Sequence, residues 1–381
     1  MVYSKKALKN KSKVIITFII VSLIFLKISY REVKLGIHWT DYPKTYEEQL
    51  CYQFVAEMLS SPTYGIYTNY LEDSSFQEDE AKGHQILSES EGLMMLYSVK
   101  ANEKKVFDQH AYVVSEYMVL PNHLFRWRID RNGEKISESS AAIDDLRIIR
   151  ALLLAYDRWG DRQYKGMLFK ATKAVQKYEV DNNQLVDFYD SNSKEKASSI
   201  TLAYIDLYTM DLLSKIDASW EKVEANGKEV ILRGKISEDM PFYHKTFDYK
   251  TRQYHVDEFV NMIDTMMILK HLSEVGECPD DAILWLIDQM KTKGGVYLRY
   301  HASSGEAMST MESTAVYALG AQIAVNIKND ELYEMMINKM LRYQIYLPSS
   351  GLYGAFGDEI KQEVYSFDNL NALLAFRKDG E

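Results

Sequence analysis

Residues Gln85–Ala101 read QILSESEGLMMLYSVKA, and the rest of the chain is organised around this stretch. The apolar residues of Leu93–Val99 follow i, i+3, i+4 spacing, which predicts a helix with a broad buried face. Glu89–Gly92 lies just ahead of that face. A carboxyl group that loses solvent there can stay protonated near neutral pH and act as an acid. Alternatively, Ser88 or Ser90 caps the helix and the glutamates only complement its dipole.

A series of helical patterns follows residue 45, and the chain has only six prolines to interrupt them. Several are apolar over more than one stripe, such as Ile148–Tyr156 (IIRALLLAY), which is typical of helices covered on two sides. The expected helices are Tyr46–Ser60, Ser88–Ala101, Lys104–Val119, Ala141–Trp159, Asp161–Val180, Ser198–Leu213, Val256–Val275, Pro279–Thr292, Ser309–Ile327, Asn329–Tyr343 and Gln362–Phe376.

The inserts between these helices alternate aromatic with polar residues and predict short hairpins. They are Phe125–Glu134, Leu185–Lys194, Phe242–Tyr254 and Gly295–Glu306. A unit of two helices joined by an aromatic-rich loop is repeated about six times. This repetition indicates an all-α fold, an (α/α)6 barrel or toroid whose loops form a cleft at one end. No Gly/Ser-rich linker divides the chain, so we expect one domain over residues 46–381.

The N-terminus has a different character. Five lysines precede an apolar run, Val14–Ile28, which is the pattern of a basic region followed by a signal sequence. Because no small-residue cleavage site follows, we expect residues 1–31 to be a cytoplasmic tail and uncleaved signal anchor, with 32–45 as a spacer. A single pass would place the main domain outside the cell membrane. The alternative is secretion after cleavage.

Charge limits the partners. Residues 1–31 carry seven positive charges and no acids, so the net charge of −10 for the chain leaves about −17 on the remainder. An acidic body of this kind argues against nucleic acid as a partner. Cys51 and Cys278 either remain unpaired in the core or pair outside the cell. No phosphate loop, dinucleotide fingerprint or metal-ligand spacing is present, so we expect no cofactor and no metal.

Two segments resemble glycoside hydrolase family 8. Ser90-Glu91-Gly92 matches the segment that bears the general acid in that family, and Ala151-Leu152-Leu153-Leu154-Ala155, followed by Trp159, matches the end of its Ala-Ser/Thr-Asp-Ala-Asp helix. Ile143 replaces the first Asp of that helix, whereas Asp145 matches the second. Met94 and Met95 replace glycines that usually follow Ser-Glu-Gly. The chain is most similar to divergent, membrane-attached members that accompany exopolysaccharide synthases in Gram-positive bacteria.

The resemblance implies single-step inversion by two carboxyl groups, one protonated and one ionised, on opposite sides of a cleft. It implies Glu91 as the acid and an Asp base at a later junction between a loop and a helix. Asp257 fits that position, with Asp264 and Asp248 as further candidates. We expect Asp257 and Asp264 to share one helix face. The alternative for Asp257 is a helix cap.

Other residues are candidates for substrate binding. The resemblance suggests Trp127 as an aromatic sugar platform, flanked by Arg128, and Asp145 as an acceptor for a sugar hydroxyl. Core packing for Trp127 and a dipole role for Asp145 remain open. The full set of expected binding residues is Trp127, Arg128, Asp145, Tyr204, Tyr254 and Asp264.

We therefore expect a membrane-tethered, extracellular endo-acting glycoside hydrolase that cuts a β-linked exopolysaccharide, with the synthase or export machinery as a candidate partner. The expectation requires Glu91 to face a groove. A catalytically inactive glycan-binding or scaffold protein is the main alternative, and a polysaccharide lyase or another toroidal hydrolase is the second.

Overall fold

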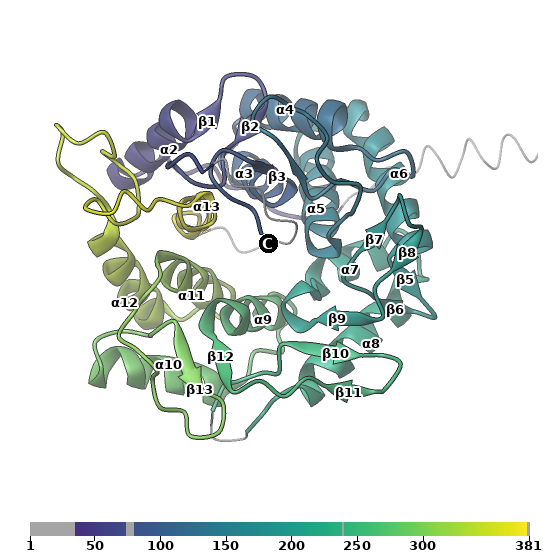
Figure 1. Cartoon of the computed structure of the whole chain (residues 1–381). Helices are drawn as coiled ribbons and strands as arrows, with labels where there is room; N and C mark the ends of the chain where they lie inside the picture. Colours follow the sequence, from purple (N-terminus) through teal and green to yellow (C-terminus); the bar gives the residue numbers. More distant parts are fainter. Residues whose placement is uncertain (1–34, 74–79, 238–239, 379–381) are drawn as a thin grey trace, which may run out of the picture. The chain divides into compact units, whose positions relative to one another are not determined.

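The computed structural model describes residues 35–73, 80–237 and 240–378, and His38–Glu381 is one compact unit. Within this unit the helices form two concentric layers (Figure 1). Each inner helix contacts the next and the last contacts the first, so the ring is closed. The inner helices are α3 (Ser88–Lys100), α5 (Ala142–Trp159), α7 (Leu207–Ser214), α9 (Met262–Glu274), α11 (Thr314–Asn326) and α13 (Ser366–Ala375).

The outer helices cover this ring, and their buried faces are narrower. They are α2 (Tyr46–Met58), α4 (Lys104–Val113), α6 (Arg162–Tyr178), α8 (Trp220–Arg233), α10 (Asp280–Thr292) and α12 (Asp330–Met340). Helix α5 is buried almost all round from Ala142 to Ala155, because it packs against α3, α6 and α7. The (α/α)6 barrel expected from the sequence is therefore confirmed.

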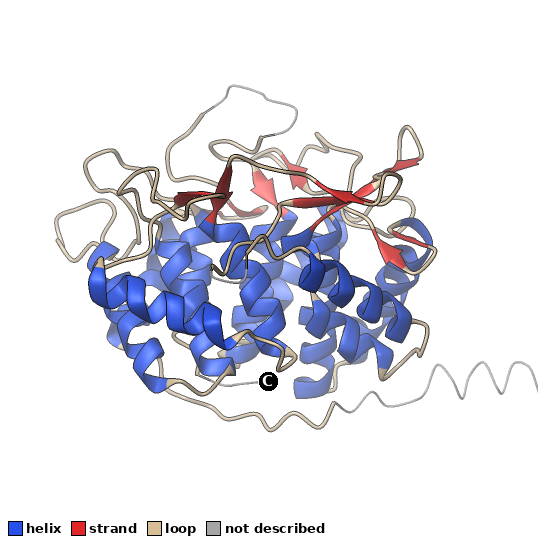
Figure 2. Ribbon diagram, turned by 90° about the horizontal axis from the view of Figure 1, so that it is seen from below, coloured by secondary structure: helices blue, strands red, loops and turns tan. Residues whose placement is uncertain are grey.

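Short strands gather at one end of the ring, where the inner helices begin (Figure 2). They form two-stranded pairs and one three-stranded sheet of order β11-β10-β9, all antiparallel. The strands are β1 (Ser60–Ser61), β2 (Gly65–Ile66), β3 (Ile86–Leu87), β4 (Arg128–Ile129), β5 (Val180–Asp181), β6 (Gln184–Leu185), β7 (Tyr189–Asp190), β8 (Glu195–Lys196), β9 (Ser199–Thr201), β10 (Thr246–Asp248), β11 (Gln253–Tyr254), β12 (Phe259–Asn261) and β13 (Arg299–His301).

Three sequence expectations are corrected. Helix α7 starts at Leu207 rather than Ser198, because Ser199–Thr201 pairs with β10 and Asp206 caps the helix by accepting from Thr209 N. Helix α9 starts at Met262 rather than Val256, since Phe259–Asn261 pairs with β13. Asp257 and Asp264 therefore do not share a helix face. Helix α8 was not expected, although its buried residues Trp220, Val223, Gly227 and Ile231 have helical spacing.

The expected anchor, residues 1–31, lies outside the described residues. Among the helices that are described, none has the length and apolar character needed to cross a bilayer. Both cysteines are free, with Cys51 buried against Asn369.

Candidate active site

Glu91 lies inside the wall of the barrel. Its side chain is fully buried, with Oε1 accepting a hydrogen bond of 2.8 Å from Ile66 N and Oε2 lying 2.7 Å from His110 Nδ1. Ile66 belongs to β2 and His110 to the outer helix α4. A Cβ on Gly65 would lie only 2.3 Å from Oε1 of Glu91. These contacts enclose the carboxyl group between the two layers, and they leave it no face toward a groove.

The neighbours of Glu91 also have packing roles. Ser90 Oγ lies 2.9 Å from Ser366 Oγ on α13. A Cβ on Gly92 would lie 3.1 Å from Cδ of Arg147, so the glycine allows α5 to approach α3 closely. Met94 and Met95, which stand where glycines were expected, are buried core residues. The Ser-Glu-Gly motif thus joins α3 to its three neighbours.

Glu89, two residues earlier, lies on a different face of α3. It is half-buried, and burial raises the pKa of its carboxyl group to about 7. The Asp144 carboxylate raises this pKa further, whereas the Arg147 guanidinium opposes the shift. Glu89 lies seven residues, or two helical turns, before Leu96. Leu96 lines a small cavity to which all six inner helices contribute, so Glu89 shares the face of α3 that points into the ring.

Asp144 and Arg147 accompany Glu89 from the first turn of α5. Arg147 Nη1 donates to Asp144 Oδ1 over 2.5 Å, and Ser88 Oγ donates to Asp144 Oδ2 over 2.8 Å. Burial raises the pKa of Asp144, although Arg147 and Ser88 counteract the shift. The sequence analysis expected Asp145 as a sugar-binding residue, whereas the structure places Asp144 beside Glu89. The distinguishing signal is the spacing of Asp144 from Arg147, which places them on neighbouring turns.

Tyr204 and Asp187 continue this cluster. Burial raises the pKa of the Tyr204 hydroxyl, with Asp144, Glu89 and Asp187 all adding to the shift. Asp187 accepts hydrogen bonds from the backbone and the hydroxyl of Thr201 on β9. Tyr204 was an expected binding residue, and the structure brings it to the acidic cluster around Glu89. Asp187 was not among the binding residues expected from the sequence.

Asp257 and Asp264, expected from the sequence as candidates for the base, lie near each other. Asp264 lies in the first turn of α9; burial raises its pKa, Lys245 lowers it, and Asp257 raises it. Asp257 precedes β12, with Oδ1 lying 3.4 Å from His255 Nε2 and Oδ2 buried without a hydrogen-bond partner. Lys245 also lowers the pKa of Asp187, so a single cation acts on both Asp187 and Asp264. Asp248 instead caps an exposed turn through Thr251.

Asp145 lies away from this cluster. It is fully buried, and its Oδ1 accepts a 2.9 Å hydrogen bond from Phe125 N. Burial raises its pKa, and the neighbouring Glu179 raises it further. Glu179 accepts a 2.5 Å hydrogen bond from Ser140 Oγ, and burial raises its pKa to about 8. This carboxyl pair supports the wall of the barrel, and sequence reasoning did not identify Glu179.

The remaining expected residues are dispersed. Arg128 is buried and donates a hydrogen bond to the Glu80 carbonyl. Its guanidinium stacks on the Trp127 ring, 4.2 Å from the ring centroid. This contact holds the half-buried Trp127 beside the start of α3. The backbone supports this position, since Ser88 N donates to the Trp127 carbonyl. Tyr254 lines a separate cavity beside α8.

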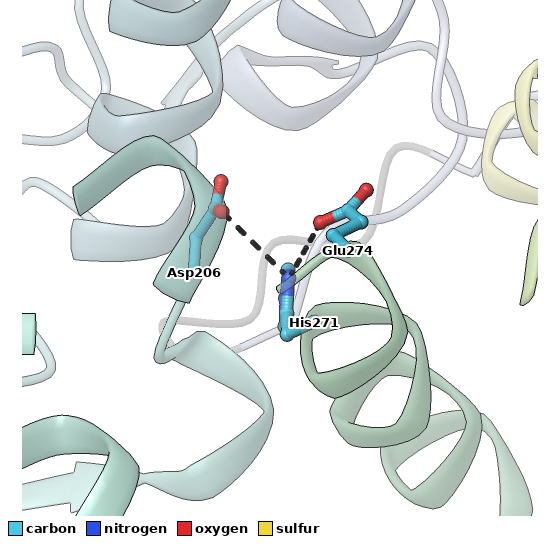
Figure 3. A group of neighbouring side chains, drawn as sticks. All are labelled: Asp206, His271 and Glu274. Atoms are coloured by element: carbon cyan, nitrogen blue, oxygen red, sulfur yellow. Dashed lines mark ion pairs between the residues drawn. The ribbon is translucent and has the colours of Figure 1, made fainter. Parts of the chain in front are cut away.

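One group has the donor types of a metal site. Asp206, at the start of α7, lies close to His271 and Glu274 in the last turn of α9, with His271 Nδ1 lying 3.8 Å from Asp206 and 3.6 Å from Glu274 (Figure 3). Arg150 makes a bidentate contact of 3.0 and 3.1 Å with Glu274, and Lys270 binds the same carboxylate. These two cations lower the pKa of Glu274 and Asp206. Because they balance both carboxylates, we interpret the group as an ion-pair network.

Comparison with known proteins shows a family match and several relatives. The model of the family "Glycosyl hydrolases family 8" matches residues 66–191. The putative lipoprotein YdaJ of Bacillus subtilis (strain 168) is 29% identical over 85% of this chain and 88% of its own length. A structure described as a novel α-amylase from Clostridium perfringens is 43% identical, has a TM-score of 0.82, and is matched over 88% of this chain and 98% of that one. PssZ from Listeria monocytogenes shares the fold at 23% identity and a TM-score of 0.67, over 88% of this chain and 97% of that chain.

Proposed function

Because this chain belongs to glycosyl hydrolase family 8, we propose that it hydrolyses a polysaccharide with Glu89, rather than Glu91, as the proton donor. The observation that carries the proposal is the half-buried Glu89 carboxyl with a pKa of about 7, grouped with Asp144, Arg147 and Tyr204. A carboxyl group with this pKa is substantially protonated at neutral pH. It can therefore give a proton to the departing glycosidic oxygen.

The base in this proposal is Asp257, with Asp264 as its neighbour. An inverting hydrolase needs an ionised carboxylate that activates water on the face of the sugar opposite the acid. The unpartnered Oδ2 of Asp257 has a free lone pair for such a water. Asp264 and Lys245 would then set the charge around it. Asp144, held by Ser88 and Arg147, would accept hydrogen bonds from sugar hydroxyls.

The substrate class follows from the charges. The proposed site carries five carboxyl groups, from Glu89, Asp144, Asp187, Asp257 and Asp264. The Arg147 guanidinium opposes the rise in the pKa of Glu89 and Asp144, and the Lys245 ammonium opposes the rise in the pKa of Asp187 and Asp264. We therefore propose a neutral or positively charged polymer, and the family resemblance favours a β-linked exopolysaccharide cut at internal bonds.

A second substrate is favoured by one comparison. The Clostridium perfringens protein, at 43% identity, is described as an α-amylase. We therefore propose an α-linked glucan such as starch as the alternative polymer. Incubating the purified protein with starch, with β-linked glucans and with the host exopolysaccharide separates the two, since only the true substrate yields new reducing ends.

We also propose that the protein is attached to the cell membrane. The basic and apolar N-terminal segment and the name of the relative YdaJ, a putative lipoprotein, support attachment to the outer face of the cell membrane. Fractionation of cells expressing the full chain, followed by protease treatment of intact cells, tests it. Protein recovered only in the medium would favour the secreted alternative.

The test of the catalytic proposal is a matched pair of variants. Glu89→Gln should lower the rate on polymer by at least about 10³-fold without changing the melting temperature. Glu91→Gln should retain most activity but unfold more readily, because it weakens a buried hydrogen-bonded pair. Full activity of Glu89→Gln would refute the assignment. Polymer binding by the wild type without new reducing ends would favour the glycan-binding alternative.

A further inference from the structure

A second cluster of aromatic side chains lies outside the candidate active site. The β10–β11 hairpin and the outer helix α8 enclose a cavity of about 230 Å³. Phe247, Tyr249 and Tyr254 line it from the hairpin, with ring centroids 4.7 Å apart for Phe247 and Tyr254 and 5.3 Å apart for Phe247 and Tyr249. A volume of this size has room for several water molecules. It suits one or two sugar units rather than a long segment.

The rings are held in place before any ligand arrives. The Tyr249 hydroxyl donates to the Leu185 carbonyl over 2.8 Å, and the Tyr254 hydroxyl donates to the Val230 carbonyl over 2.7 Å. Both polar tips are therefore used within the protein, and the aromatic rings supply the apolar part of the cavity lining. Flat, fixed aromatic surface of this kind is suited to packing against the apolar face of a sugar ring.

Polar groups at the rim complete the cavity. Arg252 stands at a tight turn with φ of +58° and is exposed, and within the described ranges it has no ion-pair partner. Gln184 also lines the cavity, and in the described part of the chain its side chain makes no hydrogen bond. Guanidinium and amide groups are donors that recognise sugar hydroxyls. This cavity therefore combines aromatic rings held in place with hydrogen-bond donors that have no partner among the residues the structure describes, which is not the arrangement of a packed core.

One sheet connects this cavity to the candidate active site. In the sheet β11-β10-β9, Phe247 pairs with Tyr254 on one side and Thr246 pairs with Thr201 on the other. Thr201 donates to Asp187, and the Asp187 carboxylate also raises the pKa of Tyr249. A polymer bound near Asp187 therefore lies close to the strands that hold the aromatic cluster.

We propose that this cavity, lined by Phe247, Tyr249, Tyr254, Gln184 and Arg252, is a second, non-catalytic binding site for a sugar unit of the polysaccharide. The identity of the polymer rests on the proposed function. The site would hold the chain while Glu89 acts on a neighbouring part of it or on another chain. It adds affinity for long substrates and adds nothing for short ones.

Affinity electrophoresis in gels containing the polymer tests the inference. Glu89→Gln provides an inactive background, into which Arg252→Ala and Gln184→Ala are introduced together, with Arg342→Ala as a control for loss of an exposed arginine. We expect the double change to weaken polymer binding about 5- to 10-fold, or roughly 1–1.4 kcal/mol, and the control to leave it unchanged. Tyr254→Leu, if its melting temperature is unaltered, should have the same effect.

Kinetics of the otherwise wild-type enzyme provide the second measurement. Arg252→Ala with Gln184→Ala should raise KM for polymer while kcat/KM for a short oligosaccharide stays the same. Unchanged polymer affinity in a folded double variant would overturn the inference, even if hydrolysis by Glu89 is intact. If the protein proves unable to hydrolyse the polymer but binding still depends on Arg252, the proposed function fails and the second site stands.

Discussion

His110 Nδ1 lies 2.7 Å from Oε2 of Glu91, and both side chains are buried between the inner helix α3 and the outer helix α4. The same carboxylate accepts a hydrogen bond from Ile66 N through its other oxygen. Both oxygens of Glu91 are thus occupied within the protein. Through these contacts the Ser-Glu-Gly motif connects the two layers of the barrel.

His110→Ala should therefore reduce stability and spare catalysis. Removing one partner of a buried pair leaves the other uncompensated, which costs about 3–5 kcal/mol. Urea denaturation should report this loss, while kcat at a temperature where the variant is folded should match the wild type. A variant of normal stability would show that the pair contributes little.

Gly65→Ala tests how closely β2 approaches Glu91. Gly65 has φ of +114° and an added Cβ would lie 2.3 Å from Oε1, so the substitution combines backbone strain with a clash. Gly276→Ala is the matched control, because it has φ of +74° but open space around the new Cβ. The control should lose about 1–2 kcal/mol. Gly65→Ala should lose more than the control in the same thermal unfolding assay, and equal losses would remove the clash from the explanation.

Periodicity was sufficient to predict the architecture. Alternating helices with loops between them gave the barrel, because apolar stripes on both sides of helices such as Ile148–Tyr156 require two covering layers. It did not give the starts of α7 and α9. The first residues of the two expected helices instead form strands β9 and β12. The partners of β9 are 45 to 49 residues away and those of β12 are 38 to 42 residues away, and no local pattern encodes such a pairing.

The candidate site was harder to predict, because adjacent acidic residues point in different directions. In α3, Glu89 and Glu91 are two positions apart, or about 200° around the helix, so one can face the barrel interior while the other faces the outer layer. In α5, Asp144 and Asp145 are one position apart, or about 100° around the helix, and they accept hydrogen bonds from different partners, Ser88 Oγ and Phe125 N. The motif match identified the segment, and the choice between Glu89 and Glu91 in our proposal comes from the fold. Telling Glu89 from Glu91 requires knowing that His110 and Ile66 contact Glu91, and these contacts are visible only in the folded structure.

The activity should fall on the alkaline side with an apparent pKa near 7. Glu89 must be protonated to act as the acid, and its pKa is raised to about 7 by burial and by Asp144. Asp144→Asn removes a negative neighbour, so the alkaline limb of kcat/KM should move to lower pH. Arg147→Met removes a positive neighbour and should move it to higher pH. Identical pH profiles in all three proteins would exclude Glu89 as the titrating acid.

Metal chelation should leave the protein unchanged, whereas Arg150→Met should destabilise it. Arg150 and Lys270 balance the carboxylates of Asp206 and Glu274, so the network needs no added cation. Loss of Arg150 leaves buried carboxylate charge and should cost about 3–5 kcal/mol. The measurements are melting temperature and activity with and without EDTA. A lower melting temperature in EDTA that is restored by one divalent metal would instead identify the Asp206, His271 and Glu274 group as a metal site.

The Asp145 and Glu179 pair should make the protein less stable as pH rises. Burial raises both pKa values, that of Glu179 to about 8, so between pH 4.5 and 8 the folded state binds more protons than the unfolded state. The free energy of unfolding then decreases with pH across that window, by at most about 1.4 kcal/mol per unit for each proton. Glu179→Gln keeps an acceptor for Ser140 Oγ and removes the proton. Chemical denaturation at pH 5, 6.5 and 8 should therefore show a shallower slope for Glu179→Gln than for the wild type, and equal slopes would show that the pair does not titrate in this range.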